Sequence, residues 1–423
     1  MNILVMTNTY KPIVGGLERS IEIFSNQYRK YGHKVLIVAP DFEDAPRERG
    51  VVRIPALQKI RGTDFSVHLP IPGVLSRTLK RFKPDIVHSH QPFLMGETAF
   101  RIAAQYDIPL VFTFHTLYER YTYYMPGNPK KVQRFVIRLA SGYANLCDYV
   151  FAPSRGVAQL LRRRKVMVPI ETIPTGIDVD TFKRDDSALA RRKLNLPQKS
   201  FVVGSVGRIN PEKNIHFLIE AVKDFMKANH DAHFLLVGKG LLEKEVTEFF
   251  RDQGLKDRFH FTGVLFDEDL VCAYRAMDVF VFASKTETQG IVLNEAMATE
   301  VPVIALAGPG VNDIVIHGLN GHLLHSDKVA DFTQSLKKYA SLSQEERFMY
   351  RQNARNTALR FSLKTSVIKA LDIYEELIRQ DRRASPRTRA LWSKPADKLK
   401  TEWRLLRNLT QAMSAAFGVK LKR

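Results

Sequence analysis

The chain has 423 residues, of which 45% are hydrophobic and 26% are charged, a balance that is typical of a globular protein and excludes a disordered one. Two cysteines are too few for a disulfide framework, so we expect burial to stabilise the core in a reducing compartment. No signal peptide is recognisable, and no apolar run reaches the roughly 20 residues of a membrane span. These features predict a cytoplasmic protein of two or three domains, unless it lies on a membrane surface.

The formal net charge of +20 is distributed unevenly along the chain. Residues 1–170 contain 25 Lys/Arg and 12 Asp/Glu, and residues 382–423 contain 12 and 2, whereas residues 171–381 contain 27 and 30. Both ends are therefore strongly basic and the middle is nearly neutral. This polarity suggests that one face meets an extended anion, either nucleic acid or anionic lipid.

The first predicted element is a buried parallel strand at residues 2–6, followed by Gly15-Gly16 and a helix at 17–31 that Gly32 ends. Later apolar runs predict further strands at 34–39, 84–88, 110–114 and 148–152. Because strands alternate with helical patterns, we predict a parallel α/β domain over residues 1–170.

The same pattern starts again after a charged segment at 174–199, which we interpret as a linker. A helix is predicted at 215–229, and the second set of strands lies at 201–207, 233–237, 258–262, 279–283 and 301–305. We expect two doubly wound, Rossmann-like domains that face a cleft, since ligands of such sheets bind beyond the carboxyl ends of the strands. The second domain spans 171–361, a helix at 362–381 completes the first, and residues 382–423 form a basic helical tail.

Two loops of the second domain carry the candidate chemistry. Arg208 and Lys213 follow a strand and could clamp a diphosphate, although they could equally be surface cations. The loop after the strand at 279–283 opens a helix at Gly290, where free backbone N–H groups at residues 290–292 favour a phosphate. Glu287 and Glu295 lie on either side of this helix start, and carboxylates accept hydrogen bonds from sugar and ribose hydroxyls. The alternative, a helix-start glutamate and a surface glutamate, fits Glu295 less well than Glu287.

Several other classes of site are disfavoured by missing motifs. The chain has no Walker-type phosphate loop and no complete Gly-x-Gly-x-x-Gly after a strand, which argues against a P-loop ATPase and a nicotinamide dehydrogenase. No Cys/His cluster has zinc spacing. His88 and His90 have no third ligand nearby, so we interpret them as pocket or core residues and expect no metal site.

The spacing of Glu287 and Glu295 resembles the Glu-x7-Glu motif of retaining glycosyltransferases of family 4, which have the GT-B fold. The resemblance covers roughly residues 1–380, because matching segments occur in the same order. These segments are residues 12–18, 112–115, 152–154, 175–178, 207–208, 212–214, 262–263, 295–298 and 301–303.

The resemblance implies a role for each matching position. Gly15 and Gly16 approach the donor phosphate, and His115 contacts the transferred sugar. Arg208 and Lys213 neutralise the departing diphosphate. The remaining donor-binding positions are Glu287 at the sugar hydroxyls, with the N–H groups of Gly290, Ile291 and Val292 beside it, Glu295 at the ribose and Val264 at the base. The resemblance also implies that the configuration of the sugar is retained and that no metal is needed. It implies no cofactor beyond the nucleotide-sugar substrate, which is UDP-glucose or GDP-mannose.

Residues 113–121 together with 286–290 resemble most the branch of the family that glucosylates diacylglycerol from UDP-glucose. A GDP-mannose donor is the alternative, with phosphatidylinositol, a lipopolysaccharide or oligosaccharide, or a soluble polyol as acceptor. The sequence therefore predicts a glycosyltransferase whose acceptor is a membrane lipid on the cytoplasmic leaflet.

Charge supports a lipid surface independently of that resemblance. Residues 130–138 form a basic amphipathic stretch and residues 162–165 a second basic cluster. In the tail, helical spacing places Leu399, Trp403, Leu406, Met413 and Phe417 on one stripe beside Lys398, Lys400, Arg404 and Arg407. The residues expected to face the membrane are Lys130, Lys131, Arg134, Arg138, Trp403, Arg404 and Arg407.

Two alternatives to this membrane surface stay open. The tail stripe could pack on the protein's own surface or on a partner. A nucleic-acid-binding protein would also be basic, but the basic clusters lack interleaved aromatic residues, so we expect no nucleic-acid partner.

Overall fold

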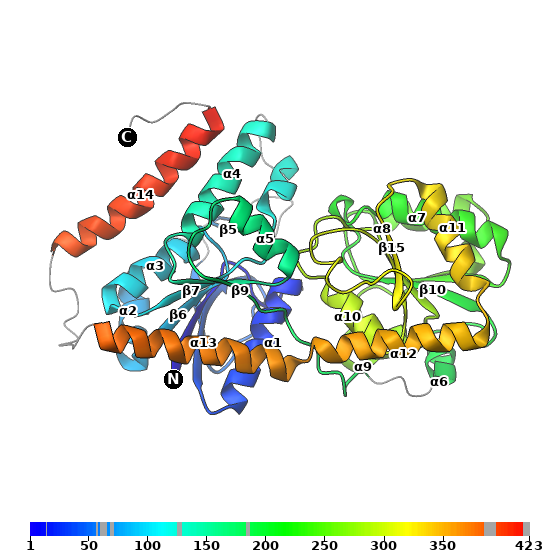
Figure 1. The fold of residues 1–423 in the computed structure, drawn as a ribbon, viewed down its shortest axis with the longest axis horizontal. Coiled ribbons are helices and arrows are strands. Elements are labelled where there is room, and N and C mark those ends of the chain that lie inside the picture. The colour runs from blue at the N-terminus through cyan, green and yellow to red at the C-terminus, as the bar shows by residue number, and fades with distance from the viewer. Residues whose placement is uncertain are drawn as a thin grey trace. The chain divides into compact units, whose positions relative to one another are not determined.

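The structure is a computed structural model that describes residues 1–13, 15–55, 58–59, 66–67, 72–124, 129–182, 187–384 and 395–417. The chain forms two compact α/β units (Figure 1). The first contains Met1–Thr175 and Ser366–Arg423, and the second contains Gly176–Thr365. The first unit is thus built from two separate stretches of chain, whereas the second is continuous.

The first unit is built on a sheet of parallel strands in the order β3-β2-β1-β6-β7-β8-β9. The strands are β1 Asn2–Met6, β2 Lys34–Asp41, β3 Val51–Pro55, β6 Ile86–Ser89, β7 Leu110–Thr113, β8 Tyr149–Ala152 and β9 Ile170–Thr172. The helices are α1 Gly16–Lys30, α2 Pro72–Phe82, α3 Met95–Tyr106, α4 Pro129–Ala144, α5 Arg155–Arg163, α13 Leu363–Ala384 and α14 Pro395–Phe417. A short hairpin, β4 Gln58–Lys59 and β5 Ser66–Val67, and a 3-10 helix, η1 Tyr118–Tyr124, complete the unit.

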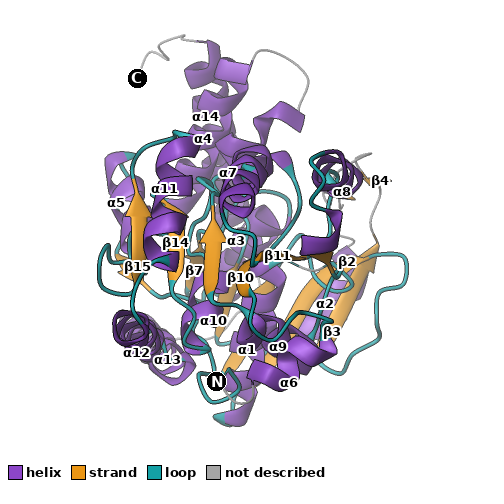
Figure 2. Cartoon of the chain, turned by 90° about the vertical axis from the view of Figure 1, so that its right-hand side faces the viewer, coloured by secondary structure: helices purple, strands orange, loops and turns teal. Residues whose placement is uncertain are grey.

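The second unit has its own parallel sheet, in the order β12-β11-β10-β13-β14-β15 (Figure 2). Its strands are β10 Phe201–Val206, β11 Ala232–Val237, β12 Phe259–Phe261, β13 Val279–Phe282, β14 Val303–Leu306 and β15 Gly321–Leu324. Its helices are α6 Ser187–Lys193, α7 Ile215–Ala228, α8 Glu243–Asp252, α9 Asp267–Ala276, α10 Ile291–Ala298, α11 Val329–Ala340 and α12 Gln344–Arg360, with 3-10 turns η2 Pro211–Lys213 and η3 Lys256–Arg258. Alternate strand residues enter two separate apolar clusters, which identifies a sheet covered on both faces.

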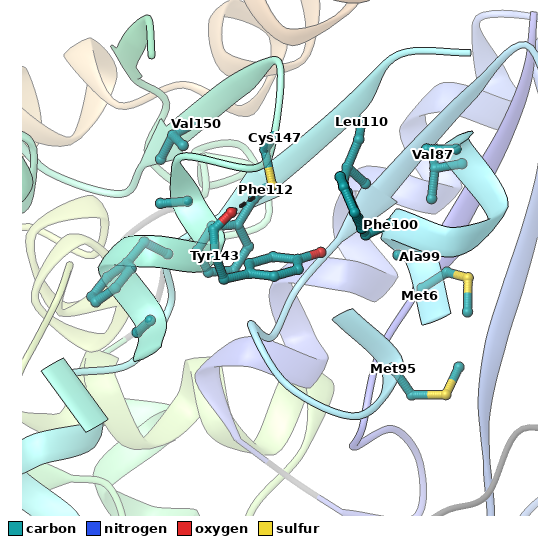
Figure 3. Packing of buried hydrophobic residues seen from close by; sticks show 14 of the residues in the cluster. Met6, Val87, Met95, Ala99, Phe100, Leu110, Phe112, Tyr143, Cys147 and Val150 are labelled. Carbon is teal, nitrogen blue, oxygen red and sulfur yellow. Dashed lines mark hydrogen bonds between the residues drawn. The ribbon is translucent and has the colours of Figure 1, made fainter. Parts of the chain in front are cut away.

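Tyr143 of α4 lies at the centre of the packing in the first unit (Figure 3). Its ring meets Phe112 of β7 edge to face, with centroids 5.1 Å apart, and its hydroxyl donates to the carbonyl of Gly96, 2.8 Å away. A Cβ at Gly96 would overlap the carbonyl oxygen of Gln91, so this glycine permits the close approach. The arrangement fixes α3 and α4 against the carboxyl ends of β6 and β7.

The predicted fold class is confirmed, and each predicted strand and helix has a counterpart in the structure. Gly32 has φ +83°, in the left-handed region expected after a helix. Five of the described strands were not predicted: β3 and β9 at the edges of the first sheet, β15 at an edge of the second, and the two strands of the β4–β5 hairpin. The residues of β9 are only half-buried, so this strand lacks the continuous apolar run of an inner strand.

The interpretation of 174–199 as a linker is wrong. Ile177, Val179 and Phe182 are buried in an apolar cluster of the second unit. Arg191 of α6 donates to the Asp278 carboxylate at 2.7 Å and to the carbonyl of Ala276 at 3.2 Å. Most of the described charged side chains of this segment are exposed, but its buried apolar residues and Arg191 make it part of the second unit.

The basic tail is not a separate region either, because α14 packs on α4 and α3 within the first unit. The helix expected at 362–381 is α13, which belongs to the first unit from Ser366 onward. Within the described ranges, no helix combines the length and the apolar character needed to cross a bilayer.

Candidate functional site

Lys213 and Glu287 come together at the carboxyl ends of β10 and β13. These strands are parallel neighbours, so the loops that follow them emerge at the same edge of the sheet. Lys213 ends the short turn η2, and its ammonium group forms an ion pair and a hydrogen bond with the carboxylate of Glu287. Residues 74 positions apart in the sequence thus meet where the sequence predicted a diphosphate site.

The charges around Glu287 keep it ionised. Burial by itself would raise the pKa of this carboxyl, but Lys213 and Arg208, together with the hydroxyl of Ser284, outweigh burial and hold the pKa below its ordinary value. The side chains of Lys213 and Glu287 are each 18% exposed, so both can still be reached from solvent.

Arg208 has a carboxylate partner that the sequence did not reveal. The Arg208 guanidinium lies 3.7 Å from Oε1 of Glu212, and the Glu212 side chain is only 1% exposed while that of Arg208 is 40% exposed. The amide of Asn210 donates to the same oxygen at 3.3 Å. Glu212 therefore pairs with Arg208 from the buried side, while the Arg208 side chain as a whole stays partly exposed. The i, i+4 spacing was the only signal in the sequence for this pair.

The start of α10 has the backbone geometry of an anion site. Gly290 precedes the helix with φ +77°, a conformation that favours glycine, and the N–H groups of Ile291 and Val292 belong to the unpaired first turn. The Gly310 amide donates to the carbonyl of Glu287 at 3.0 Å, which ties the preceding loop to the loop after β14. Glu287 and the helix start therefore lie on one segment, which this hydrogen bond anchors.

Glu295 and Val264 differ in their exposure. Glu295 is 1% exposed and accepts a hydrogen bond of 2.7 Å from the hydroxyl of Tyr274 in α9. Val264 follows β12 and is 38% exposed. The contacts of these residues with a ribose and a base stay predictions, and for Glu295 such a contact requires part of its carboxylate to be uncovered.

The candidate residues of the first unit also follow strands. Gly15 caps α1, and the carboxylate of Glu18 lies 2.5 Å from where a Cβ at Gly15 would be, so that a larger residue would displace it. Gly16 begins the helix. His115 follows β7, and its neighbours are two histidines from the end of β6.

His88, His90 and His115 form a cluster of adjacent rings, in which His88 and His90 are buried and His115 is half-buried. Nδ1 of His90 is 2.8 Å from Nε2 of His115, with the rings stacked at a centroid distance of 5.0 Å. Nε2 of His88 is 2.7 Å from Oγ1 of Thr113, and its Nδ1 is 2.5 Å from the hydroxyl of Tyr374 in α13. All three imidazoles line a cavity of about 10 Å³, enough for about one water molecule.

These three imidazoles are neutral at pH 7. Burial lowers the pKa of His88 and of His115 to about 3, and burial together with the other two rings lowers the pKa of His90 well below its ordinary value. His88 and His90 are buried pocket residues, as the sequence predicted. Within the described residues, no three His, Cys, Asp or Glu side chains are grouped to hold a metal ion, and metal independence stays a prediction.

Comparison with solved structures identifies the class of this fold. HepE of Anabaena, in complex with UDP and glucose, superposes with a TM-score of 0.71 over 89% of this chain and 99% of that one, at 22% identity. Two parallel-sheet units of this kind, with polar loops after their strands, define a GT-B glycosyltransferase fold.

The particular family follows from the sequence comparisons. Residues 14–181 match the model described as Glycosyltransferase Family 4, and residues 186–357 match Glycosyl transferases group 1. An alpha-monoglucosyldiacylglycerol synthase of Streptococcus pneumoniae is 30% identical over 341 residues, 77% of this chain and 76% of that protein. A GDP-mannose-dependent alpha-mannosyltransferase of Corynebacterium glutamicum is 28% identical, with 79% of each chain covered. The chain belongs to the family 4 glycosyltransferases, as its motifs predicted.

Proposed function

We propose that this protein transfers glucose from UDP-glucose to diacylglycerol, with retention of configuration and without a metal, while bound to the inner face of an anionic membrane. Among its relatives, the alpha-monoglucosyldiacylglycerol synthase of S. pneumoniae supports the choice of sugar and acceptor. The single observation that carries the chemistry is the Lys213–Glu287 pair beside Arg208.

The pair suits a leaving diphosphate. Lys213 and the solvent-facing side of Arg208 offer two cations to the phosphates, and fixed cations stabilise the charge that develops as the sugar detaches. Glu287, kept ionised by these cations, accepts hydrogen bonds from sugar hydroxyls. The amide groups of Ile291 and Val292 lie on the same loop segment and contribute a positive helix end.

His115 has a different part in this proposal. Since its pKa is about 3, its ring is neutral at pH 7 and serves as a hydrogen-bonding group beside the transferred sugar, not as a cation. Gly15 and Gly16 leave room for the donor phosphates at the end of β1. We assign no covalent nucleophile. Among the residues described, the hydrogen bonds of the histidine cluster in the first unit involve no carboxylate.

The experiment is a transfer assay with radiolabelled UDP-glucose, UDP-galactose and GDP-mannose, each with and without diacylglycerol in anionic mixed micelles. We expect label in the lipid phase from UDP-glucose only when diacylglycerol is present. Lipid label from GDP-mannose would instead favour the activity named for the C. glutamicum relative, with a different acceptor. Label that stays in the aqueous phase with every donor would overturn the lipid acceptor.

A further inference from the structure

Helix α14 packs on α4 and α3 within the first unit (Figure 1, red). One face of α14 is buried in these contacts, and that face consists of Thr401, Leu405, Asn408, Ala412 and Ala416. Asn408 packs directly on Gly142 of α4, where a Cβ would overlap its side chain. The α14 helix is therefore a docked element with a defined inner side.

Polar contacts secure this docking at both ends. Glu402 accepts two hydrogen bonds from Arg101 of α3, at 2.8 and 3.0 Å, and these bonds hold the pKa of Glu402 below its ordinary value. Arg138 of α4 donates to Gln411 at 3.1 Å, and Asn408 donates to the carbonyl of Leu139 at 3.2 Å. Arg138 thus serves the α4–α14 interface, and we leave it out of the surface described below.

The outer face of α14 is apolar and exposed. At 3.6 residues per turn, the stripe predicted from the sequence is centred about 140° from the docked face, so it lies on nearly the opposite side of the helix. The exposed fractions of its side chains are 71% for Leu399, 65% for Trp403, 53% for Leu406, 49% for Met413 and 63% for Phe417. Single exposed apolar residues are ordinary, but a stripe of five on one face marks an interaction surface.

Cations surround this outer stripe. On α14 the exposed basic residues are Lys398, Lys400, Arg404 and Arg407, and on the first turns of α4 they are Lys130, Lys131 and Arg134. The ammonium group of Lys131 lies 5.3 Å from the ring centroid of Phe417, so the basic start of α4 adjoins the end of the stripe. The guanidinium of Arg404 lies 5.0 Å from the ring of Phe100, on α3. Of the two acidic residues of α14, Glu402 is already paired with Arg101.

We propose that the outer stripe of α14, together with Lys130, Lys131 and Arg134 of α4, is a preformed docking surface for a phospholipid bilayer with anionic headgroups. An apolar ridge with large aromatic side chains enters the headgroup region, and the surrounding cations bind the lipid phosphates. The basic residues around the stripe favour an anionic lipid surface over an apolar protein surface as the partner. The α14 part of this surface lies beyond the residues that match the family models, which end at residue 357, whereas the α4 part lies within them.

This inference names the membrane partner of the proposed function, but it does not depend on catalysis. Vesicle binding is measured without a donor, and turnover is measured in neutral detergent micelles without vesicles. If the surface is assigned wrongly, substitution of its residues leaves vesicle binding unchanged, and turnover is also unaffected. If the proposed reaction is wrong, turnover with diacylglycerol is absent while binding follows the surface.

The test is co-sedimentation of the full chain with phosphatidylcholine vesicles that contain or lack phosphatidylglycerol. We expect binding to the anionic vesicles, and about 100-fold weaker binding after combined Trp403→Ser, Leu406→Ser and Phe417→Ser substitution. The matched control is Phe348→Ser with Met349→Ser, two residues of α12 that are 56% and 59% exposed and lie in the second unit. It should bind as the unchanged protein does. Unchanged binding of the triple variant would overturn the proposal.

The charges are tested separately. Combined Lys398→Gln, Lys400→Gln and Arg407→Gln substitution should weaken binding to anionic vesicles by about 100-fold, at roughly tenfold or less per cation, and leave the weak binding to neutral vesicles unchanged. Equal binding of the unchanged protein to neutral and anionic vesicles would contradict the assignment. Self-association that the triple apolar variant abolishes in the absence of vesicles would identify a second copy of the chain as the partner and overturn it as well.

Fluorescence reports the position of the stripe directly. The chain has two tryptophans, so Trp392→Phe leaves Trp403 as the sole emitter. Its emission should shift to the blue when phosphatidylglycerol vesicles are added, because the indole ring leaves water. An unshifted spectrum from vesicle-bound protein would place the contact elsewhere and overturn the role of α14.

Discussion

The two polar clusters of this protein both lie at the carboxyl ends of strands in parallel sheets, yet they have opposite electrostatics. In the second unit, Lys213, Arg208 and Glu287 are charged and partly exposed. In the first unit, His88, His90 and His115 are neutral, and burial keeps them so. The difference teaches that the strand ends of a parallel sheet can hold charged, partly exposed side chains in one unit and neutral, hydrogen-bonded side chains in the other.

Removal of the central cation tests the charged cluster and should have the largest effect. Lys213→Ala is expected to lower turnover by about 100-fold, because one fixed electrostatic donor is typically worth that much. Steady-state transfer kinetics with the preferred donor measure it. The control, Lys227→Ala, removes a cation of α7 that binds Gln253, and it should leave turnover unchanged. Near-normal turnover of Lys213→Ala would remove this residue from the site.

The neutral cluster should respond to geometry and not to charge. His90→Phe keeps a ring but loses the hydrogen bond to His115, and we expect turnover to fall about tenfold, the rate equivalent of one hydrogen bond. His90→Asn places an amide near the position of Nδ1 and should restore most of the loss. Measurement of kcat and KM for both variants distinguishes a hydrogen-bonding role of His90 from a role in packing. If His90→Asn were as impaired as His90→Phe, the ring would matter for packing alone.

The two clusters should also lose stability in different pH ranges. His115 has a pKa of about 3 in the folded chain and an ordinary pKa of 6.5, so the unfolded chain binds the extra proton as the pH falls below 6.5. Each such histidine should cost about 1–2 kcal/mol between pH 6.5 and 5. Glu287 has a lowered pKa, so its contribution is lost only at lower pH, as the pH falls below the ordinary value of 4.5.

Urea unfolding at pH 6.5 and pH 5 measures this difference. His115→Asn should reduce the loss of unfolding free energy over that interval, whereas Glu287→Gln should leave it unchanged. A His115→Asn variant with the same pH dependence as the unchanged protein would show that the imidazole is not held neutral.

The smallest expected effect concerns the link between His88 and α13. Tyr374→Phe removes the hydroxyl that contacts Nδ1 of His88 and the hydroxyl of Tyr28, and should lower the free energy of unfolding by about 1 kcal/mol. Tyr31→Phe, at an exposed tyrosine, is the control in the same urea titrations. Equal stability of Tyr374→Phe and Tyr31→Phe would mean that the buried hydroxyl contributes nothing.

Sequence patterns predicted the parts of this protein that depend on local periodicity. The inner strands are continuous apolar runs, and the loops after β10 and β13 contain the residues that the structure brings together. The α14 stripe also followed from spacing alone.

Long-range contacts could not be predicted in this way. The pairing of His90 with His115 depends on β6 and β7 being neighbours, and the burial of Glu212 depends on the packing of the loop that holds it. The segment 174–199 was misread because its charged residues hide one buried anchor, Arg191. Helical spacing gives two opposite faces for α14 but does not say which one docks, since Asn408 and Thr401 are polar and are nevertheless buried.

Because the first unit is built from two separate stretches of chain, the two units cannot be completed in the order in which they begin during synthesis. The second unit is one continuous stretch, so all of its residues have been made when residue 365 is added. The first unit begins earlier but is complete only after its last helices have been made. The hydrogen bonds of Tyr28 and His88 with Tyr374 can form only when Tyr374 has emerged from the ribosome. Domains fold as units during translation, so the later-starting unit is the first to be complete. A ribosome stalled just after residue 365 has left the exit tunnel therefore carries a second unit that can be complete and a first unit whose histidine cluster still lacks its tyrosine.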